Sequence, residues 1–219
     1  FTANWNAVVG ATGYELDVYT GSILANQVVA EWSFPTDGTT VTATNASINN
    51  TTKTLTVGGG TSAIVDNSGV PLTRAASATN WDSGSNVKFW QIEVNTLGIN
   101  NLKLSSSQRS SNTGPKNFKI QYKVSNDWID VPDGAVVVAN DATTGVISNL
   151  TLPNACNDKS SLLIRWIMTS NTSANNATVA SGGTSRIDDI LINGDISNQV
   201  FVSGFENMNV GNVTSKNIT

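Results

Sequence analysis

The chain contains no histidine. Histidine is the usual general base near neutral pH, the usual partner of a nucleophilic serine or cysteine, and a common metal ligand. Its absence argues against those hydrolases and against most transition-metal sites. Charged residues are also scarce, at 13% of the chain with a net charge of −4 and a pI of about 4.7. Because no basic stripe is present, binding to nucleic acid or to an anionic membrane surface is disfavoured.

Two further shortages concern cysteine and long apolar segments. Cys156 is the only cysteine of the chain, so no internal disulfide can form. A small buried hydrophobe is favoured over a reactive thiol for this residue. No apolar run approaches the roughly 20 residues that a bilayer-spanning helix needs, so no membrane insertion is expected.

The residues that are abundant favour β-structure. Hydrophobic residues make up 39% of the chain, and serine, threonine and asparagine supply most of its polarity. This mixture suits strands with one wet face and is typical of extracellular β proteins. Period-two alternation predicts strands at 28–34, 53–57, 87–94, 100–104, 117–124, 128–131, 135–138, 146–152, 162–168 and 186–192. No segment has helical periodicity, so residues 23–196 are predicted to form an all-β jelly-roll sandwich.

The two ends of the chain carry segments that resemble the same type of domain. The first half carries Phe1-Thr-Ala-Asn-Trp-Asn6 and Ala11-Thr-Gly-Tyr-Glu-Leu-Asp-Val18, and the last carries the segment from Phe201 to Ser215. These segments resemble fibronectin type III repeats of secreted Bacteroidota proteins. The resemblance implies that residues 1–22 and 197–219 are two halves of one fibronectin III-like sandwich, with the jelly roll inserted between them. The chain is then expected to be a cassette of a longer secreted or surface protein.

The middle of the chain resembles another group of domains. It carries Trp90-Gln-Ile-Glu-Val94, a Ser-Gln-Arg…Thr-Gly-Pro stretch at 105–115 that leads into Phe118-Lys-Ile-Gln-Tyr122, and Arg186-Ile-Asp-Asp-Ile190. These segments are similar to the MAM-like and galactose-binding-like accessory domains of secreted bacterial hydrolases and nucleases. Most members of these families are non-catalytic. Their ligands vary, so the resemblance does not identify one.

Asp188 and Asp189 are consecutive in a predicted strand, so alternation places them on opposite faces and at least one must look toward a buried layer. A buried carboxylate needs a partner. One interpretation is a structural Ca²⁺ site formed by Glu31, Asp188 and Asp189 with loop carbonyls, because the first and last strands of a jelly roll lie side by side and MAM-like domains place a cation there. The alternative is a salt bridge from one of these carboxylates. Its partner would be Arg74, Arg165 or Arg186. Hydrogen bonds from turn amides would satisfy the carboxylate equally well.

Two kinds of residue are candidates for ligand contact. Trp81 lies in a turn, where its ring either stacks on a sugar or closes one end of the sandwich. Gln108, Arg109, Asn112 and Asn171 lie in polar loops, where their amides and guanidinium can bind hydroxyls or instead satisfy the loop backbone. The remaining tryptophans of the middle region lie on predicted strands and are expected in the core: Trp32, Trp90, Trp128 and Trp166.

These observations favour a non-catalytic function. Glu31 and Glu93 are the only glutamates of the middle region, and nothing in the pattern distinguishes an acid from a nucleophile. The leading hypothesis is an extracellular or cell-surface accessory module that binds polysaccharide or a surface glycan, beside neighbouring domains of the same long chain. The alternative is a structural spacer or adhesin segment that makes protein–protein contacts.

Overall fold

The computed structural model describes residues 9–10, 23–68, 74–141 and 143–197. The chain divides into two units, one comprising residues 23–197 and the other residues 1–22 with 198–219. The predicted fibronectin III-like halves fall almost wholly outside the described residues, so that assignment and the predicted domain boundaries stay predictions. Among the described residues, no helix is long and apolar enough to span a membrane.

The described residues form strands and two short 3-10 helices, with no α-helix among them. The strands of the first half are β1 (Ile23–Trp32), β2 (Asn45–Ala46), β3 (Leu55–Gly58), β4 (Val65–Ser68), β5 (Arg74–Ala78) and β6 (Phe89–Val94). Those of the second half are β7 (Ile99–Ser110), β8 (Asn117–Lys123), β9 (Ile129–Val137), β10 (Gly145–Thr151), β11 (Leu162–Met168) and β12 (Ser185–Ser197). The 3-10 helices are η1 (Ile48–Asn50) and η2 (Asn154–Cys156).

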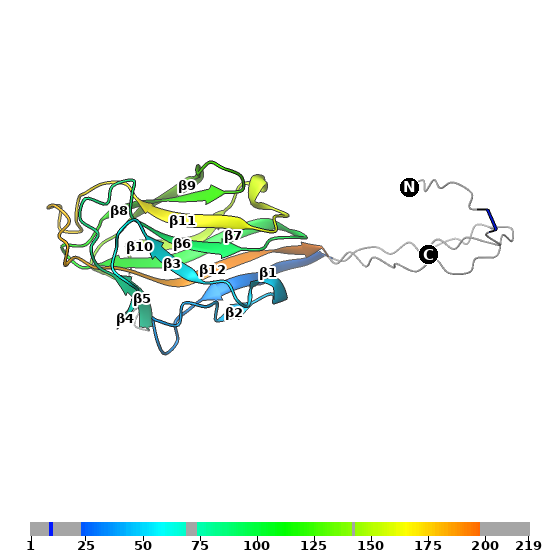
Figure 1. The fold of residues 1–219 in the computed structure, drawn as a ribbon, viewed down its shortest axis with the longest axis horizontal. Coiled ribbons are helices and arrows are strands. Elements are labelled where there is room, and N and C mark those ends of the chain that lie inside the picture. Colours follow the sequence, from blue (N-terminus) through cyan, green and yellow to red (C-terminus); the bar gives the residue numbers. More distant parts are fainter. Residues whose placement is uncertain (1–8, 11–22, 69–73, 142, 198–219) are drawn as a thin grey trace. The chain divides into compact units, whose positions relative to one another are not determined.

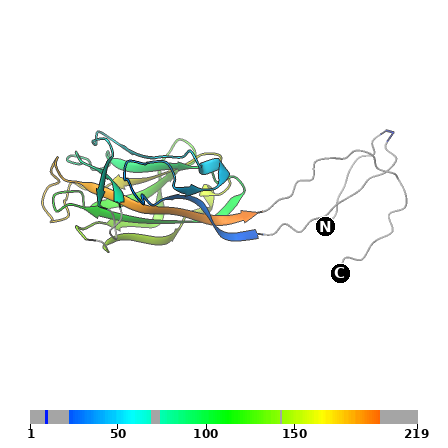
Figure 2. The same ribbon diagram turned by 90° about the horizontal axis from the view of Figure 1, so that it is seen from below.

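The strands form two stacked sheets, which confirms the predicted all-β sandwich (Figure 1). The five-stranded sheet has the order β3-β6-β11-β8-β9. The seven-stranded sheet has the order β10-β7-β12-β1-β2, and β5 joins it at β12 with β4 beside β5. The first and last strands, β1 and β12, pair antiparallel, as expected. The start of β1 and the end of β12 therefore lie at the same end of the sandwich (Figure 2).

Alternation along each strand explains which face it buries. On β11, Leu162, Ile164 and Trp166 point into the core, whereas Leu163 and Arg165 are only partly buried and face outward. The same pattern holds on β6, and on β8 it is interrupted only at Gln121, which is buried although it lies in an outward position. Burying each large apolar side chain contributes roughly 1.5–3 kcal/mol, so the interior between the sheets is the main source of stability.

Two buried indoles connect the sheets. Trp90 on β6 donates its N–H to the Ser185 hydroxyl on β12 at 3.1 Å, and Trp166 on β11 donates to the Ser106 hydroxyl on β7 at 3.1 Å. A buried N–H without an acceptor would cost free energy, and each of these serines supplies the acceptor for the tryptophan on the opposite sheet. The predictions that Trp32, Trp90 and Trp166 lie in the core are confirmed. Cys156 is also buried, and burial raises the pKa of its thiol to about 12.

The observed strands differ from the predicted ones in three places. β7 continues to Ser110, although the segment from Ser105 onward is predicted as a polar loop, because its inward serines and Gln108 lie among buried residues. The predicted strands 128–131 and 135–138 form a single strand, β9. The short strands β2, β4 and β5 escape prediction, since two residues or a run of small residues carry no clear alternation.

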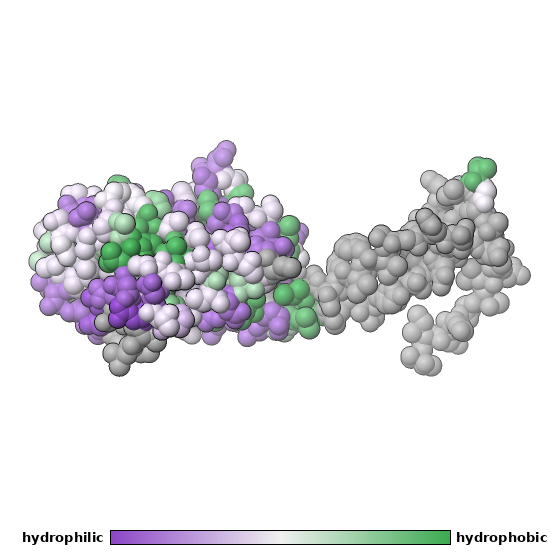
Figure 3. All heavy atoms as spheres, turned by 60° about the horizontal axis from the view of Figure 1, so that its bottom comes forward, coloured by the Kyte–Doolittle hydropathy of each residue, from purple (hydrophilic) through white to green (hydrophobic). Residues whose placement is uncertain are grey.

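The surface agrees with the low charge of the chain. On the side shown in Figure 3, most of the described surface is hydrophilic or near neutral, interrupted by a compact apolar patch.

Candidate functional site

The outer face of the five-stranded sheet carries a continuous row of polar side chains. Strand register places one residue from each strand in a single line across the sheet. We call these residues the polar row: Thr56 on β3, Gln91 on β6, Arg165 on β11, Gln121 on β8 and Asp130 on β9. On β6, β11 and β8 the residues on either side of the row are buried, so the row lies on the face of the sheet away from the core, although Gln121 itself is only 8% exposed.

Hydrogen bonds join three of these five residues into one unit. Arg165 donates from Nε and Nη2 to Oε1 of Gln121 at 2.8 and 2.7 Å, and Gln121 donates from Nε2 to Oδ1 of Asp130 at 2.6 Å. Lys119 forms an ion pair with Asp130 at 2.9 Å. The Gln121 hydrogen bond, followed by that from Lys119, lowers the pKa of Asp130 below its ordinary value. These contacts hold the planar groups in fixed orientations.

Aromatic rings border the polar row. The Arg165 guanidinium carbon lies 4.0 Å from the centroid of the Trp128 ring and 5.6 Å from that of Phe89, both within cation–π range. Partial burial lowers the pKa of Arg165. Trp128 is partly exposed, so its prediction as a core residue is wrong. Within residues 23–68, 74–141 and 143–197 it is the only tryptophan that is not fully buried.

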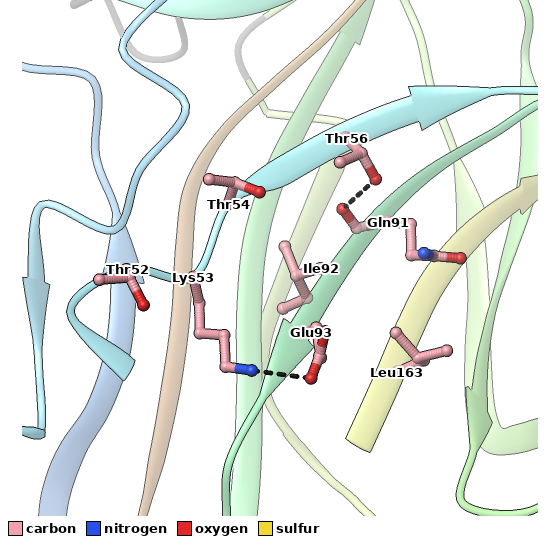
Figure 4. A pocket seen from close by; sticks show the side chains of 8 residues that line it. All are labelled: Thr52, Lys53, Thr54, Thr56, Gln91, Ile92, Glu93 and Leu163. Atoms are coloured by element: carbon pink, nitrogen blue, oxygen red, sulfur yellow. Dashed lines mark hydrogen bonds and ion pairs between the residues drawn. The ribbon is translucent and has the colours of Figure 1, made fainter. Parts of the chain in front are cut away.

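A hollow of about 280 Å³ lies at the β3 end of the polar row. Its lining comprises Thr52, Lys53, Thr54, Thr56, Gln91, Ile92, Glu93 and Leu163 (Figure 4). Lys53 Nζ forms an ion pair with Glu93 Oε1 at 2.7 Å, and this hydrogen bond is the main cause of the lowered pKa of Glu93. In the described part of the chain no hydrogen bond engages the side-chain amide of Gln91, so this amide is available to a ligand.

We call the polar row, Trp128 and this hollow together the platform. Its chemistry is that of a surface for hydroxyl-rich molecules, because amide, guanidinium and hydroxyl groups offer both donors and acceptors.

Trp81 does not belong to this surface. It is fully buried, with its ring centroid 5.6 Å from that of Trp90 and 5.7 Å from that of Phe118, and its N–H donates to the Ala78 carbonyl at 2.9 Å. No face of the ring is open to a sugar. The predicted stacking role of Trp81 is therefore corrected in favour of its alternative, a ring packed into the sandwich.

Gln108 is likewise not a surface residue. It lies on β7 instead of in a loop, and only 1% of its surface is exposed. Neither atom of its amide has a hydrogen-bond partner among the described residues. Because a ligand on the surface cannot reach this amide, its predicted binding role is corrected as well.

The other predicted ligand residues lie in or beside loops at one end of the sandwich. Arg109 donates to Asn140 Oδ1 at 3.2 and 3.1 Å, and Asn140 in turn donates to Asn112 Oδ1 at 3.2 Å, so Arg109 and Asn112 are brought together. Asn171 is not part of this cluster through its side chain, which accepts a hydrogen bond from the Ser85 backbone at 3.1 Å. Ligand contact by these residues stays a prediction.

The predicted metal ligands lie on β1 and β12. Asp189 has a φ of 48° and lies at a β-bulge, which breaks the expected alternation of faces along β12. The buried Ile187 on one side of the bulge therefore shares a face with the buried Ile190 and Ile192 on the other side. Asp188 is buried and accepts a hydrogen bond from the Asp189 N–H at 2.8 Å. Burial and then the nearby Glu31 raise the pKa of Asp189.

The fit to Ca²⁺ is partial. Glu31 and Asp189 lie close enough to repel each other, a situation that a bound cation relieves. However, no set of three or more acidic, cysteine or histidine side chains converges within the described residues. The Ca²⁺ site predicted at Glu31, Asp188 and Asp189 with loop carbonyls therefore stays a prediction.

Comparison with known proteins extends the description of the fold. No family model matches the chain, and no curated protein matches its sequence. One similar solved structure is the CBM22-1 xylan-binding domain of Paenibacillus barcinonensis Xyn10C, with a TM-score of 0.52 and 12% identity over 79% of this chain and 97% of that chain. Another is the CBM22-1–CBM22-2 tandem of the same protein, with a TM-score of 0.50 and 12% identity over 81% of this chain and 48% of that chain. Residues 23–197 thus have a jelly-roll fold of the kind found in carbohydrate-binding modules.

Proposed function

We propose that the described domain is a non-catalytic carbohydrate-binding module and that the platform is its binding surface. The observation that carries this proposal is the polar row, which crosses all five strands in one line beside the partly exposed Trp128. A line of this length suits an extended polysaccharide chain better than a single small molecule. The similarity to a xylan-binding domain in fold supports the same class of ligand.

The contacts within the platform favour binding through preorganisation. The Gln121 amide is held between Arg165 and Asp130, so little side-chain freedom is lost when a ligand arrives. The Gln91 amide has no competing partner within the described residues and can contact two hydroxyls of one sugar. The exposed part of Trp128 supplies apolar surface for the C–H face of a pyranose.

The electrostatics of the platform do not suit glycoside hydrolysis. A general acid needs a raised pKa so that it stays protonated near neutral pH. The pKa values of Glu93 and Asp130 are both lowered by hydrogen bonds from neighbouring side chains. These carboxylates act as fixed acceptors. A module of this kind would work outside the cell, beside neighbouring domains of the same chain.

Retention on immobilised polysaccharides tests this proposal. The full chain is run in affinity gels containing xylan, β-glucan, galactan or mannan, together with the variants Gln91→Ala and Trp128→Ala. Both variants are expected to lose most of the retardation that one glycan produces. Asn45→Ala is the matched control, because it removes an exposed amide from β2 of the other sheet. Retardation that survives both variants would place the site elsewhere, and no retardation by any glycan would favour the spacer or adhesin alternative.

A further inference from the structure

Three β-bulges lie near each other on the seven-stranded sheet, and an asparagine occupies each one. Asn149 on β10, Asn101 on β7 and Asn26 on β1 have φ values of 51°, 52° and 53°. Each asparagine lies where the register of its strand shifts. The shift falls between Ile147 and Leu150 on β10 and between Leu24 and Gln27 on β1. On β7 it falls between Asn100 and Lys103, opposite Gly194 of β12. The three bulges thus occur within four consecutive strands of the sheet, β10-β7-β12-β1.

These bulges open a hollow on the outer face of the sheet. Each one inserts an extra residue and turns its side chain out of the regular alternation, a device that is frequent next to functional sites. The hollow has a volume of about 480 Å³. We call it the asparagine hollow, and its lining comprises Asn26, Asn101, Lys103, Asn149, Thr151, Leu152, Asn154 and Asp195.

Asp195 fixes the centre of the hollow. Its Oδ1 accepts the backbone N–H of Asn26 and its Oδ2 accepts the side-chain amide of Asn101, both at 2.8 Å. The Asn101 bond, followed by that from Asn26, lowers the pKa of Asp195. The third bulge is held by a hydrogen bond from the Asn149 N–H to the Ser105 hydroxyl at 3.0 Å. Left-handed backbone at a residue other than glycine costs free energy, and such positions cluster at binding sites.

Several polar groups of the hollow remain available. Across the described residues, no hydrogen bond or ion pair engages the Lys103 ammonium, the Thr151 hydroxyl or the Asn154 amide. All three side chains belong to exposed residues. The hollow therefore combines a fixed carboxylate with open amide, hydroxyl and ammonium groups.

This composition selects among ligand classes. The side chains of Lys103 and Asp195 carry opposite charges, so the lining as a whole favours neither a phosphate nor a metal cation. Both carboxylate oxygens of Asp195 already accept hydrogen bonds, which also disfavours cation binding. Closely spaced amides and a carboxylate match adjacent hydroxyl groups, which are acceptors and donors at once.

We infer that the asparagine hollow is a second saccharide-binding site, on the opposite sheet from the platform, which makes the domain bivalent. The class of ligand in this inference rests on the proposed function, whereas the location of the site is independent of it. Without an aromatic ring in its lining, the hollow binds by hydrogen bonds alone and takes one or two sugar units. Two sites on opposite faces allow one domain to contact two polysaccharide chains, which raises the overall avidity without tighter single contacts.

Side-chain amide signals in a ¹⁵N NMR titration test both locations at once. The full chain is titrated separately with xylohexaose, cellohexaose, mannohexaose and β-1,4-galactotriose. The double variant Asn149→Gly with Asn154→Ala removes two amides while glycine keeps the left-handed backbone of the bulge. The control is Asn86→Gly, because Asn86 is exposed, has a φ of 58° and does not line the hollow.

The inference expects shifts of the Asn101 and Asn149 amides with at least one sugar, an affinity reduced by roughly ten-fold or more in the double variant, and no change in the control. Shifts confined to Gln91, Gln121 and Trp128 would overturn the second site and leave the proposed function standing. Shifts confined to the hollow would support the second site and refute the platform. No shift at either location with any sugar would overturn both.

Discussion

At the scale of single residues, Gln108 stands out because it buries a whole amide that has no partner among the described residues. Each buried polar group without a hydrogen bond costs about 1–3 kcal/mol. We expect Gln108→Met, which has a similar shape and no amide, to raise the free energy of unfolding by about 1–2 kcal/mol. Urea denaturation measures this change.

Gln121→Met is the matched control for this experiment. The Gln121 amide accepts two hydrogen bonds from Arg165 and donates one to Asp130, so its removal deletes these bonds and lowers stability. A loss of stability in Gln108→Met would instead mean that an internal water satisfies the amide.

Asp189 carries a second prediction at this scale. Its folded-state pKa is raised above 3.8 by burial and by Glu31, so its ionised form is disfavoured in the folded chain. Ionised Asp189 therefore lowers the free energy of unfolding at neutral pH, and this destabilisation fades as the pH falls through the folded-state pKa. Asp189→Asn is therefore expected to raise the Tm at pH 7 in EDTA. Asp130→Asn should lower it, because the pKa of Asp130 is depressed.

Added Ca²⁺ extends this test to the predicted metal site. A cation between Glu31 and Asp189 would raise the Tm of the unaltered chain and leave Asp189→Asn unchanged, as scanning calorimetry can measure. An unaltered chain whose Tm is the same in Ca²⁺ and EDTA would refute the metal prediction.

At the scale of elements, alternation alone predicts the strands whose two faces differ strongly. The bounds of β11 agree with the predicted 162–168. Prediction failed on β7, where Ser106 and Gln108 face the core although their polarity indicates a loop. For Ser106 the reason lies across the sandwich, in the Trp166 N–H that needs an acceptor, and no local pattern contains that information. The burial of Gln108, whose amide has no partner among the described residues, has no such explanation.

The cross-sheet hydrogen bond of Ser106 can be tested directly. Ser106→Ala leaves the buried Trp166 N–H without its acceptor, so we expect a loss of about 1–3 kcal/mol in the free energy of unfolding. Ser148→Ala is the control, since that serine lies exposed on β10. Thermal or urea unfolding distinguishes the two. Equal effects of both substitutions would show that the hydrogen bond contributes nothing net.

At the scale of the whole molecule, the platform depends on strand register, which the sequence does not reveal. Gln91, Gln121 and Arg165 stand in outward positions of strands that were predicted correctly, yet only the pairing of those strands lines them up. The sequence directed attention to Trp81, because a tryptophan in a turn is unusual. Trp128 carried no comparable signal, since it begins the predicted strand 128–131 and predicted strands also hold the core tryptophans.

The charges of the platform predict how binding responds to pH. The pKa of Glu93 lies below its ordinary value of 4.5 and that of Asp130 below 3.8, so their ion pairs with Lys53 and Lys119 are complete above these values. Both pairs are lost as the pH falls through the depressed pKa values. Retention on a bound polysaccharide is expected to stay constant from about pH 5 to pH 8 and to weaken below about pH 4. A decline that begins near pH 6 would contradict this assignment.

The pairing of β1 with β12 has a mechanical consequence. Ile23 and Ser197 are register partners, so the polypeptide enters and leaves the sandwich at adjacent points. Tension transmitted through the two flanking segments would pull these strands apart from their shared end, and the hydrogen bonds between them would break one after another. Such an unzipping geometry resists force weakly. If the domain binds polysaccharide as proposed, the connection between that ligand and the flanking segments of the protein would open under load.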